Sequence, residues 1–324
     1  MKRLSNILSL IFFLTSANMV FAADWPIKYR LIQKPGTYRE VTPKPDIARN
    51  GIVHVRVWYG AGLGNRLKCI VSNLRYYKPK HLNLYWQDTD WVSARFFDLF
   101  KIEGPLTVTE YNNIEVIRLA SYPEPLGPYN SGTSLIVAEN EFPDKKFRPI
   151  DGEYNNIPSE IIQKYRSWFN MFKPSDKVQA RINEVKLPPN AVAVQVRNAP
   201  DWQNYFSGNE PSEVFFELMD KYPKETVFYL SAMSKEAAEP FYQRYGNRVI
   251  ELPNKDYHSM IDATADMFIL GSTNEAIYSV GSTFSEVGWW LGGAKAKVSV
   301  AGSKDHWQYL VEPSKQRVLK DFPK

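Results

Sequence analysis

The sequence of 324 residues contains a single cysteine, Cys69. One cysteine excludes a fold held together by internal disulfides, and it excludes a metal site built from four thiolates. The sequence also lacks a block of consecutive lysines and arginines, although its net charge is +5. Such a scattered basic excess does not indicate nucleic-acid binding and suits a small anionic ligand equally well. Because Cys69 falls on the apolar side of a predicted helix, we expect it to be a core residue.

No apolar run reaches the roughly 20 residues that a membrane-spanning helix requires. The nearest candidate is N-terminal, where residues 7–14 are apolar except for one serine and follow the basic pair Lys2 and Arg3. Small residues surround a cleavage position after Ala22. We therefore interpret residues 1–22 as a secretory signal peptide, which predicts export to the periplasm, the medium or a eukaryotic secretory lumen. An uncleaved anchor is the alternative.

Short β-rich runs alternate with helical stretches from residue 51 onward. This alternation is typical of parallel sheets covered by helices on both faces. Loops rich in proline, glycine and asparagine divide this pattern into two halves. We therefore predict an α/β protein with two Rossmann-like domains, 23–155 and 156–324, and a ligand cleft between them. The predicted strands are 52–58, 82–86, 106–109, 114–118, 134–139, 191–196, 226–231, 247–252, 276–280 and 296–300, and the predicted helices are 64–77, 92–100, 158–171, 175–184, 211–221, 234–245, 257–270 and 283–291.

A glycine turn at residues 60–66 (Gly-Ala-Gly-Leu-Gly-Asn-Arg) joins the first predicted strand to the first helix. Glycine lets backbone N–H groups approach a ligand closely, and a helix N-terminus attracts phosphate. The turn departs from the dinucleotide fingerprint G-x-G-x-x-G, because Asn65 replaces its last glycine. Gly62, Gly64 and Asn65 are therefore candidate phosphate contacts. A glycine turn that serves packing alone is the alternative.

The predicted strand 191–196 delivers Gln195 and Arg197 to the edge where open α/β sheets bind ligands. An arginine that leaves a buried strand requires an anionic partner, and its planar guanidinium suits two phosphate oxygens. A structural salt bridge, for example to Asp201, is the alternative.

Two aspartates lie four residues apart on the predicted helix 257–270. Asp266 stands in an apolar run, so its carboxylate must be paired or must bind a ligand. Asp262 is interpreted as a surface acid that faces solvent.

The predicted strand 276–280 is followed by Ser282 and Thr283 at the start of a helix. Hydroxyls and free N–H groups at a helix start form a second site for an anion. Ordinary helix capping is the alternative.

The order of these motifs resembles that of a known family. The motifs are Gly-x-Gly-Asn at 62–65, Val-x-Val-Arg-x3-Asp-Trp at 194–202, Asp-Met-Phe-Ile-Leu-Gly at 266–271 and Gly-Ser-Thr-Phe-Ser at 281–285. They are similar to motifs of the fucosyltransferase superfamily, which includes protein O-fucosyltransferases, core α1,6-fucosyltransferases and bacterial nodulation fucosyltransferases. The spacing is nearest to that of the protein O-fucosyltransferases, and the resemblance spans about residues 51–300.

The resemblance implies the two-domain GT-B fold and an enzyme that transfers fucose from GDP-fucose, inverts the anomeric carbon and needs no metal or other cofactor. The acceptor would be a glycan or glycoprotein. By the same resemblance, Arg197 would grip the β-phosphate and Asn65 the donor phosphate or sugar. Asp266 would belong to the guanosine site, and the diphosphate would lie against Ser282 and Thr283, with Phe284 beside them.

The sequence departs from the family pattern in two respects. Gln195 stands where many members have a histidine that contacts guanosine, which leaves the nucleotide preference open. The sequence also does not identify a catalytic base. Asp201 and Glu210 lie near Arg197 in sequence and either could accept the acceptor's proton; we favour Asp201, for which a helix cap or a salt bridge is the alternative role. Two alternatives therefore remain: the same fold with another nucleotide sugar, and a non-catalytic protein that binds nucleotides or carbohydrates.

Overall fold

The computed structural model describes residues 48–49, 51–57, 61–86, 88–89, 92–111, 154, 159–198 and 210–302. The chain divides into Met1–Thr37 and Tyr38–Lys324, and all described residues belong to the second unit. The predicted signal peptide, the strands predicted at 114–118 and 134–139, and Asp201 lie outside the described residues. No helix among the described ranges combines the length and hydropathy needed to cross a membrane.

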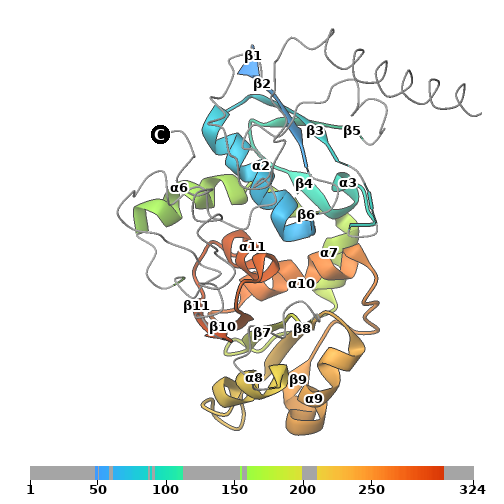
Figure 1. The fold of residues 1–324 in the computed structure, drawn as a ribbon, viewed down its shortest axis with the longest axis vertical. Helices are drawn as coiled ribbons and strands as arrows, with labels where there is room; N and C mark the ends of the chain where they lie inside the picture. The colour runs from blue at the N-terminus through green and yellow to red at the C-terminus, as the bar shows by residue number, and fades with distance from the viewer. Residues whose placement is uncertain are drawn as a thin grey trace, which may run out of the picture. The chain divides into compact units, whose positions relative to one another are not determined.

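The first sheet has the strand order β1-β2-β3-β5 (Figure 1). β2, β3 and β5 are parallel, and β1 pairs antiparallel with β2. The helix α2 follows β2 and packs against it, and its residues Leu67, Ile70 and Leu74 are buried at the spacing of one helix face. The bounds are β1 (Ala48–Arg49), β2 (Ile52–Arg56), α2 (Leu63–Tyr77), β3 (His81–Tyr85) and β5 (Thr107–Tyr111).

A small antiparallel sheet joins two segments that are distant in the sequence. β4 follows α3, and it pairs with β6, which follows α6. β6 lies in the range that the sequence assigned to the second domain, yet its partner strand lies in the range assigned to the first. The elements are α3 (Phe96–Leu99), β4 (Phe100–Ile102), α6 (Ser159–Phe169) and β6 (Phe172–Pro174).

The second sheet is entirely parallel and has the order β11-β10-β7-β8-β9. This is the doubly wound order of a Rossmann sheet, in which the chain reverses direction across the sheet between β7 and β10. Ligands of such sheets bind beyond the carboxyl ends of the strands at this reversal. The strands are β7 (Val192–Val196), β8 (Phe228–Ala232), β9 (Val249–Ile250), β10 (Glu275–Ser279) and β11 (Lys297–Ala301).

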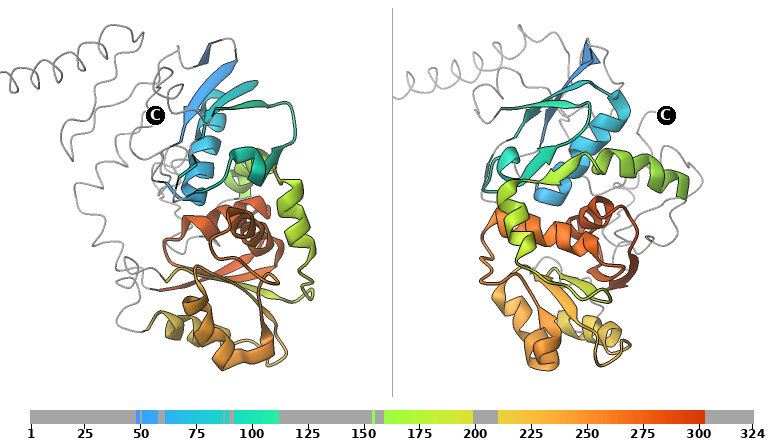
Figure 2. Two further views of the ribbon diagram at one scale, coloured as in Figure 1. Left: turned by 90° about the vertical axis from the view of Figure 1, so that its right-hand side faces the viewer. Right: turned by 180° about the vertical axis from the view of Figure 1, so that it is seen from behind.

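Helices cover both faces of the second sheet (Figure 2). On one face, α8 and α9 share a buried core with Val192, Val194 and Val196 of β7. On the other face lie α10 and α11, and Tyr278 of β10 donates a hydrogen bond to the Leu270 carbonyl of α10 at 3.2 Å. α7 packs against α10. The bounds are α7 (Asp176–Asn183), α8 (Pro211–Met219), α9 (Lys235–Tyr245), the 3-10 turn η6 (Gly246–Arg248), α10 (Met260–Ser272) and α11 (Thr283–Leu291).

The predicted α/β class with two parallel sheets is confirmed. Each strand and helix predicted within the described ranges is present, with ends shifted by a few residues. α10, for example, begins three residues later than predicted, because the Ser259 hydroxyl accepts the Asp262 N–H at 3.2 Å and fixes the cap there. β1, β4 and β6 were not predicted, because strands of two or three residues carry too little periodicity.

Candidate functional site

A cavity of about 370 Å³ lies where the carboxyl ends of β7 and β8 meet the starts of α2, α10 and α11. It is therefore at the strand reversal where a ligand is expected. Its lining includes all the described residues to which the sequence assigned a donor contact. These are, in chain order, Gly62, Gly64, Asn65, Gln195, Arg197, Asp266, Ser282, Thr283 and Phe284.

Of the three helix starts at this cavity, those of α2 and α11 come from different halves of the chain. The first N–H groups of an α-helix have no partner within the helix and carry a partial positive charge. α2 begins after Gly62, which provides no side-chain cap, whereas Ser282 caps α11 by accepting the Ser285 N–H at 3.5 Å. Ser282 thus performs the ordinary capping role and lines the cavity as well. The arrangement suits an anion between the two helix starts.

Gly64 lets the two helix starts approach each other. A Cβ atom on Gly64 would lie 2.5 Å from the Thr283 carbonyl oxygen, a distance that real Cβ atoms do not adopt. A Cβ on Gly62 would meet nothing within 4 Å. The packing role considered for the glycine turn therefore applies to Gly64, and the space at Gly62 is open.

The end of β7 is hydrogen-bonded to β10 at the strand reversal. The Arg197 N–H donates to the Ser279 hydroxyl at 2.8 Å, and that hydroxyl donates to the Gln195 carbonyl at 3.1 Å. Gln195 is 3% exposed, and its side-chain oxygen has no hydrogen-bond partner among the described residues. The same holds for the side-chain oxygen of Asn65. Buried acceptors of this kind suit a ligand that donates hydrogen bonds.

Asp266 is paired, as its apolar surroundings required. Its Oδ1 accepts the Tyr229 hydroxyl at 2.5 Å, and its Oδ2 accepts the Ser231 hydroxyl at 2.8 Å and Lys255 Nζ at 2.8 Å. Burial raises the pKa of Asp266, and the nearby Lys255 ammonium and both hydroxyl donors oppose that rise. Lys255 also lines the cavity. The sequence did not reveal Lys255, because a lysine in a polar loop is usually solvated.

The interpretation of Asp262 as a solvent-facing acid was wrong. The side chain is buried, because α7 packs against α10 and brings Arg181 to it. Arg181 donates to both carboxylate oxygens, from Nε at 2.7 Å and from Nη2 at 3.0 Å. Asp262 also accepts the Asp256 N–H at 2.9 Å, and Arg181 donates to the Pro253 carbonyl at 2.8 Å. This pair therefore fixes the loop that supplies Asp256 to the cavity wall.

A second basic residue that the sequence analysis missed is Arg66, in the first turn of α2. It is fully buried, and its Nε donates to the Ala61 carbonyl at 2.9 Å, just before the helix start. Its guanidinium carbon lies 4.8 Å from the centre of the Trp86 ring. Burial lowers the pKa of Arg66 to about 10, and the charge of Asp88 opposes that change. Arg66 thus holds the glycine turn rather than extending into the cavity.

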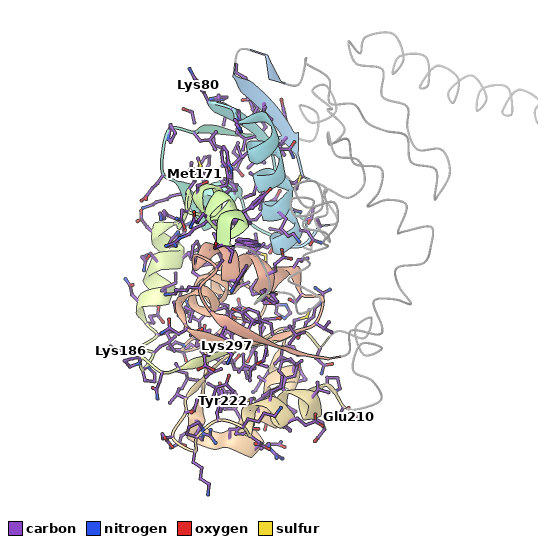
Figure 3. All side chains as sticks on the ribbon, turned by 90° about the vertical axis from the view of Figure 1, so that its left-hand side faces the viewer. Lys80, Met171, Lys186, Glu210, Tyr222 and Lys297 are labelled. Carbon is purple, nitrogen blue, oxygen red and sulfur yellow. The ribbon has the colours of Figure 1, made fainter. Side chains whose placement is uncertain are left out.

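The choice of catalytic base stays a prediction, because Asp201 lies outside the described residues. Glu210 precedes α8 and is exposed (Figure 3). It is not among the residues that line the cavity. Within the described ranges, no three His, Cys, Asp or Glu side chains are grouped so as to hold a metal ion. Cys69 is buried, as expected.

No family model matches the sequence, and no curated protein matches it. Several solved structures are similar to it at low sequence identity. A NodZ α-1,6-fucosyltransferase soaked with GDP-fucose is 18% identical, with a TM-score of 0.45 over 74% of this chain and 92% of that chain. The fucosyltransferase NodZ from Bradyrhizobium is 15% identical, with a TM-score of 0.45 over 74% and 92%. POFUT1 in complex with GDP-fucose is 13% identical, with a TM-score of 0.48 over 78% and 99%.

Proposed function

We propose that this protein is a glycosyltransferase that transfers fucose from GDP-fucose to a glycan or glycoprotein, with inversion at the anomeric carbon and without a metal ion. One observation carries the proposal. The starts of α2 and α11 and the strand-end residue Arg197, which come from both halves of the chain, line one cavity at the strand reversal. These are the groups that a nucleoside diphosphate requires of a protein.

The proposed reaction is a single displacement. The oxygen of an acceptor hydroxyl attacks the anomeric carbon while the bond between that carbon and the β-phosphate oxygen breaks. The bonding electrons leave with GDP, and the acceptor proton passes to a base, for which Asp201 is our candidate. Attack opposite the leaving group inverts the anomeric centre.

The cavity residues would act on the leaving group. Negative charge develops on the β-phosphate as the bond breaks, and fixed donors at that point stabilise the transition state. Arg197 and the starts of α2 and α11 would supply such donors, and their presence in one cavity lining supports this role. Holding donor and acceptor together in one cavity contributes the remaining part of the rate enhancement.

Thermal unfolding with a panel of nucleotides tests the proposal. A ligand at a hundredfold excess over its Kd stabilises a protein by about 2.7 kcal/mol. We expect a rise in Tm with GDP and GDP-fucose and a smaller rise with UDP-sugars. Equal shifts with all nucleotide sugars, or none, would contradict the proposal. Because Gln195 leaves the nucleotide preference open, GDP-mannose belongs in the panel.

Turnover separates an enzyme from a binding protein. We expect labelled fucose to appear in an acceptor from a screen of glycans and folded domains, with GDP released in equal amount and with activity retained in EDTA. A shift in Tm without release of GDP would instead support the non-catalytic alternative.

We also propose that the chain is exported after cleavage following Ala22. The N-terminal sequence of the protein recovered from the producing cell tests this directly. A mature chain that still begins at Met1 would contradict it.

A further inference from the structure

One wall of the cavity rests on a buried ionic network centred on Lys255. Its ammonium donates to Asp266 Oδ2 at 2.8 Å, to Glu251 Oε1 at 3.1 Å and to the Ala232 carbonyl at 3.2 Å. A lysine has three N–H donors, so all three are used. The Lys255 and Glu251 side chains are each 6% exposed, and that of Asp266 is 3% exposed. The ammonium therefore links the end of β8, the residue after β9 and the middle of α10.

The two carboxylates also accept hydrogen bonds from β8, from α9 and from the loop before α10. Glu251 Oε2 accepts the hydroxyls of Tyr242 on α9 at 3.0 Å and of Tyr257 at 2.8 Å. Asp266 accepts Tyr229 and Ser231 of β8, as described above. Each of the four carboxylate oxygens thus accepts at least one hydrogen bond. One ammonium between two carboxylates leaves a net charge of −1 beneath the cavity.

The protonation of these groups depends on their mutual contacts. Burial lowers the pKa of Lys255, but the attraction of Asp266 and Glu251 outweighs burial and raises it above its ordinary value. Burial raises the pKa of Tyr229, and the adjacent Asp266 charge raises it further, with smaller contributions from Glu251 and Asp262. The tyrosines therefore remain neutral donors, and the ammonium remains charged. Removal of that ammonium would leave two like charges in one buried site, and such a pair takes up a proton.

We propose that Lys255 is a positioning residue for the nucleotide: its ammonium offsets the negative charge of Glu251 and Asp266 and holds Asp266 at the cavity wall, so that the groups beneath the nucleotide add no pH dependence to its binding in the neutral range. This inference rests on the proposed function, because it assigns a nucleotide to the cavity. Lys255 itself has no free N–H for a ligand, since its three donors are occupied. Its effect on the ligand passes through Asp266.

A charge-balanced double variant tests this role. Lys255→Met keeps most of the side-chain length but removes the ammonium, so the net charge becomes −2 when both carboxylates are ionised. Lys255→Met combined with Glu251→Gln restores a net charge of −1 with the same missing ammonium. Glu251→Gln alone is the matched control. The affinity of each full-length protein for GDP would be measured by calorimetry from pH 6 to pH 9.

The terminal phosphate of GDP has a second pKa of about 6, so each variant is compared with the unaltered protein at the same pH. We expect the affinity of Glu251→Gln relative to the unaltered protein to stay constant. For Lys255→Met we expect the relative GDP affinity to fall about tenfold as the pH rises from 6 to 9, since one unit of pKa displacement corresponds to that factor. In the double variant the pH dependence should disappear. A purely steric role for Lys255 predicts equal losses in the single and double variants at every pH, and this result, or unchanged affinity in Lys255→Met, would overturn the proposal.

The stability of the ligand-free protein separates this inference from the proposed function. When the pKa of a carboxyl is higher in the folded protein than in the unfolded chain, the unfolding free energy falls as the pH rises from the unfolded pKa through the folded pKa. The unfolding free energy of Lys255→Met should therefore fall more steeply between pH 6 and pH 9 than that of the double variant. If GDP fails to bind the unaltered protein but this difference is present, the proposed nucleotide is wrong and the charge-setting role of Lys255 stands. Equal slopes for the two variants would refute that role.

Discussion

Arg197 occupies the point in the molecule where a strand end and two helix starts meet around one cavity. Its backbone is fixed by the hydrogen bond from its N–H to the Ser279 hydroxyl, so the direction of the chain at this position does not depend on the side chain. Substitutions of the guanidinium should therefore affect the ligand more than the fold. This separation makes Arg197 the most informative single residue for the proposed chemistry.

We expect Arg197→Ala to lower kcat for fucose transfer by about 100-fold or more, the loss typical of removing one donor to developing transition-state charge. Arg197→Lys should recover little of that activity, because one ammonium cannot make a two-pronged contact with phosphate oxygens. Steady-state kinetics with GDP-fucose would measure both. Arg244→Ala, which removes an exposed arginine of α9 outside the cavity, is the control and should retain activity. Full activity in Arg197→Ala would contradict the proposed role.

At the scale of elements, the contact between the starts of α2 and α11 depends on the missing side chain of Gly64. An added Cβ would meet backbone atoms of Thr283 and Phe284 at 2.5–2.9 Å, and backbone cannot rotate away as a flexible side chain can. Gly64→Ala should therefore force the two helices apart and lower the free energy of unfolding by about 1–3 kcal/mol.

Urea unfolding monitored by tryptophan fluorescence would measure this loss. Gly62→Ser is the matched control. Gly62 occupies the N-cap position of α2 and has open space for a Cβ atom, and serine is favoured at N-cap positions. The control should change stability by less than about 0.5 kcal/mol. If both variants lost the same free energy of unfolding, stability would depend on the backbone flexibility of the glycine turn and not on the close approach of α2 and α11.

The sequence predicted the strands and helices of the described chain because their apolar spacing repeats over at least one full helix turn or several strand residues. It could not predict β4 and β6, since each has three residues and is fixed only by pairing across more than 60 positions of sequence. The same limit explains Asp262. Its burial depends on Arg181, 81 residues away on α7, and no local pattern signals that contact.

The sequence predicted the cavity residues at strand ends and helix starts, but it did not predict the buried basic residues behind them. Strand ends and helix starts follow from local periodicity, so the lining residues on β7, α2 and α11 could be named in advance. Lys255 and Arg66 could not be, because burial of a basic side chain is decided by tertiary packing. Arg66 touches Trp86 and the turn before α2, and Lys255 links the end of β8, the residue after β9 and α10. Sequence therefore located the ligand-facing residues and missed those that hold them in place.

At the scale of the whole described molecule, a helix beside the first sheet contacts a helix beside the second. These helices are α2 and α11, and they pack against each other around a buried ion pair. Lys68 Nζ lies 2.7 Å from Glu286 Oε2, and their side chains are 5% and 0% exposed. Glu286 also accepts the Trp290 indole N–H at 3.4 Å. A buried pair of this kind contributes little net stability, but the loss of one partner leaves an uncompensated charge.

We therefore expect Lys68→Met to lower the free energy of unfolding by about 3–5 kcal/mol, the range for breaking a buried pair. Lys68→Met combined with Glu286→Leu should regain most of that loss, because the double variant leaves no unpaired carboxylate buried between α2 and α11. Lys101→Met is the control, since Lys101 forms an exposed pair with Asp176 that should be worth less than about 1 kcal/mol. Chemical unfolding of the unaltered protein, Lys68→Met, Glu286→Leu and the double variant gives the coupling energy between the two sites. If the double variant is no more stable than Lys68→Met, the pair does not act as one unit, and the contact between the two sheets' helices must depend on apolar packing and on the close approach at Gly64.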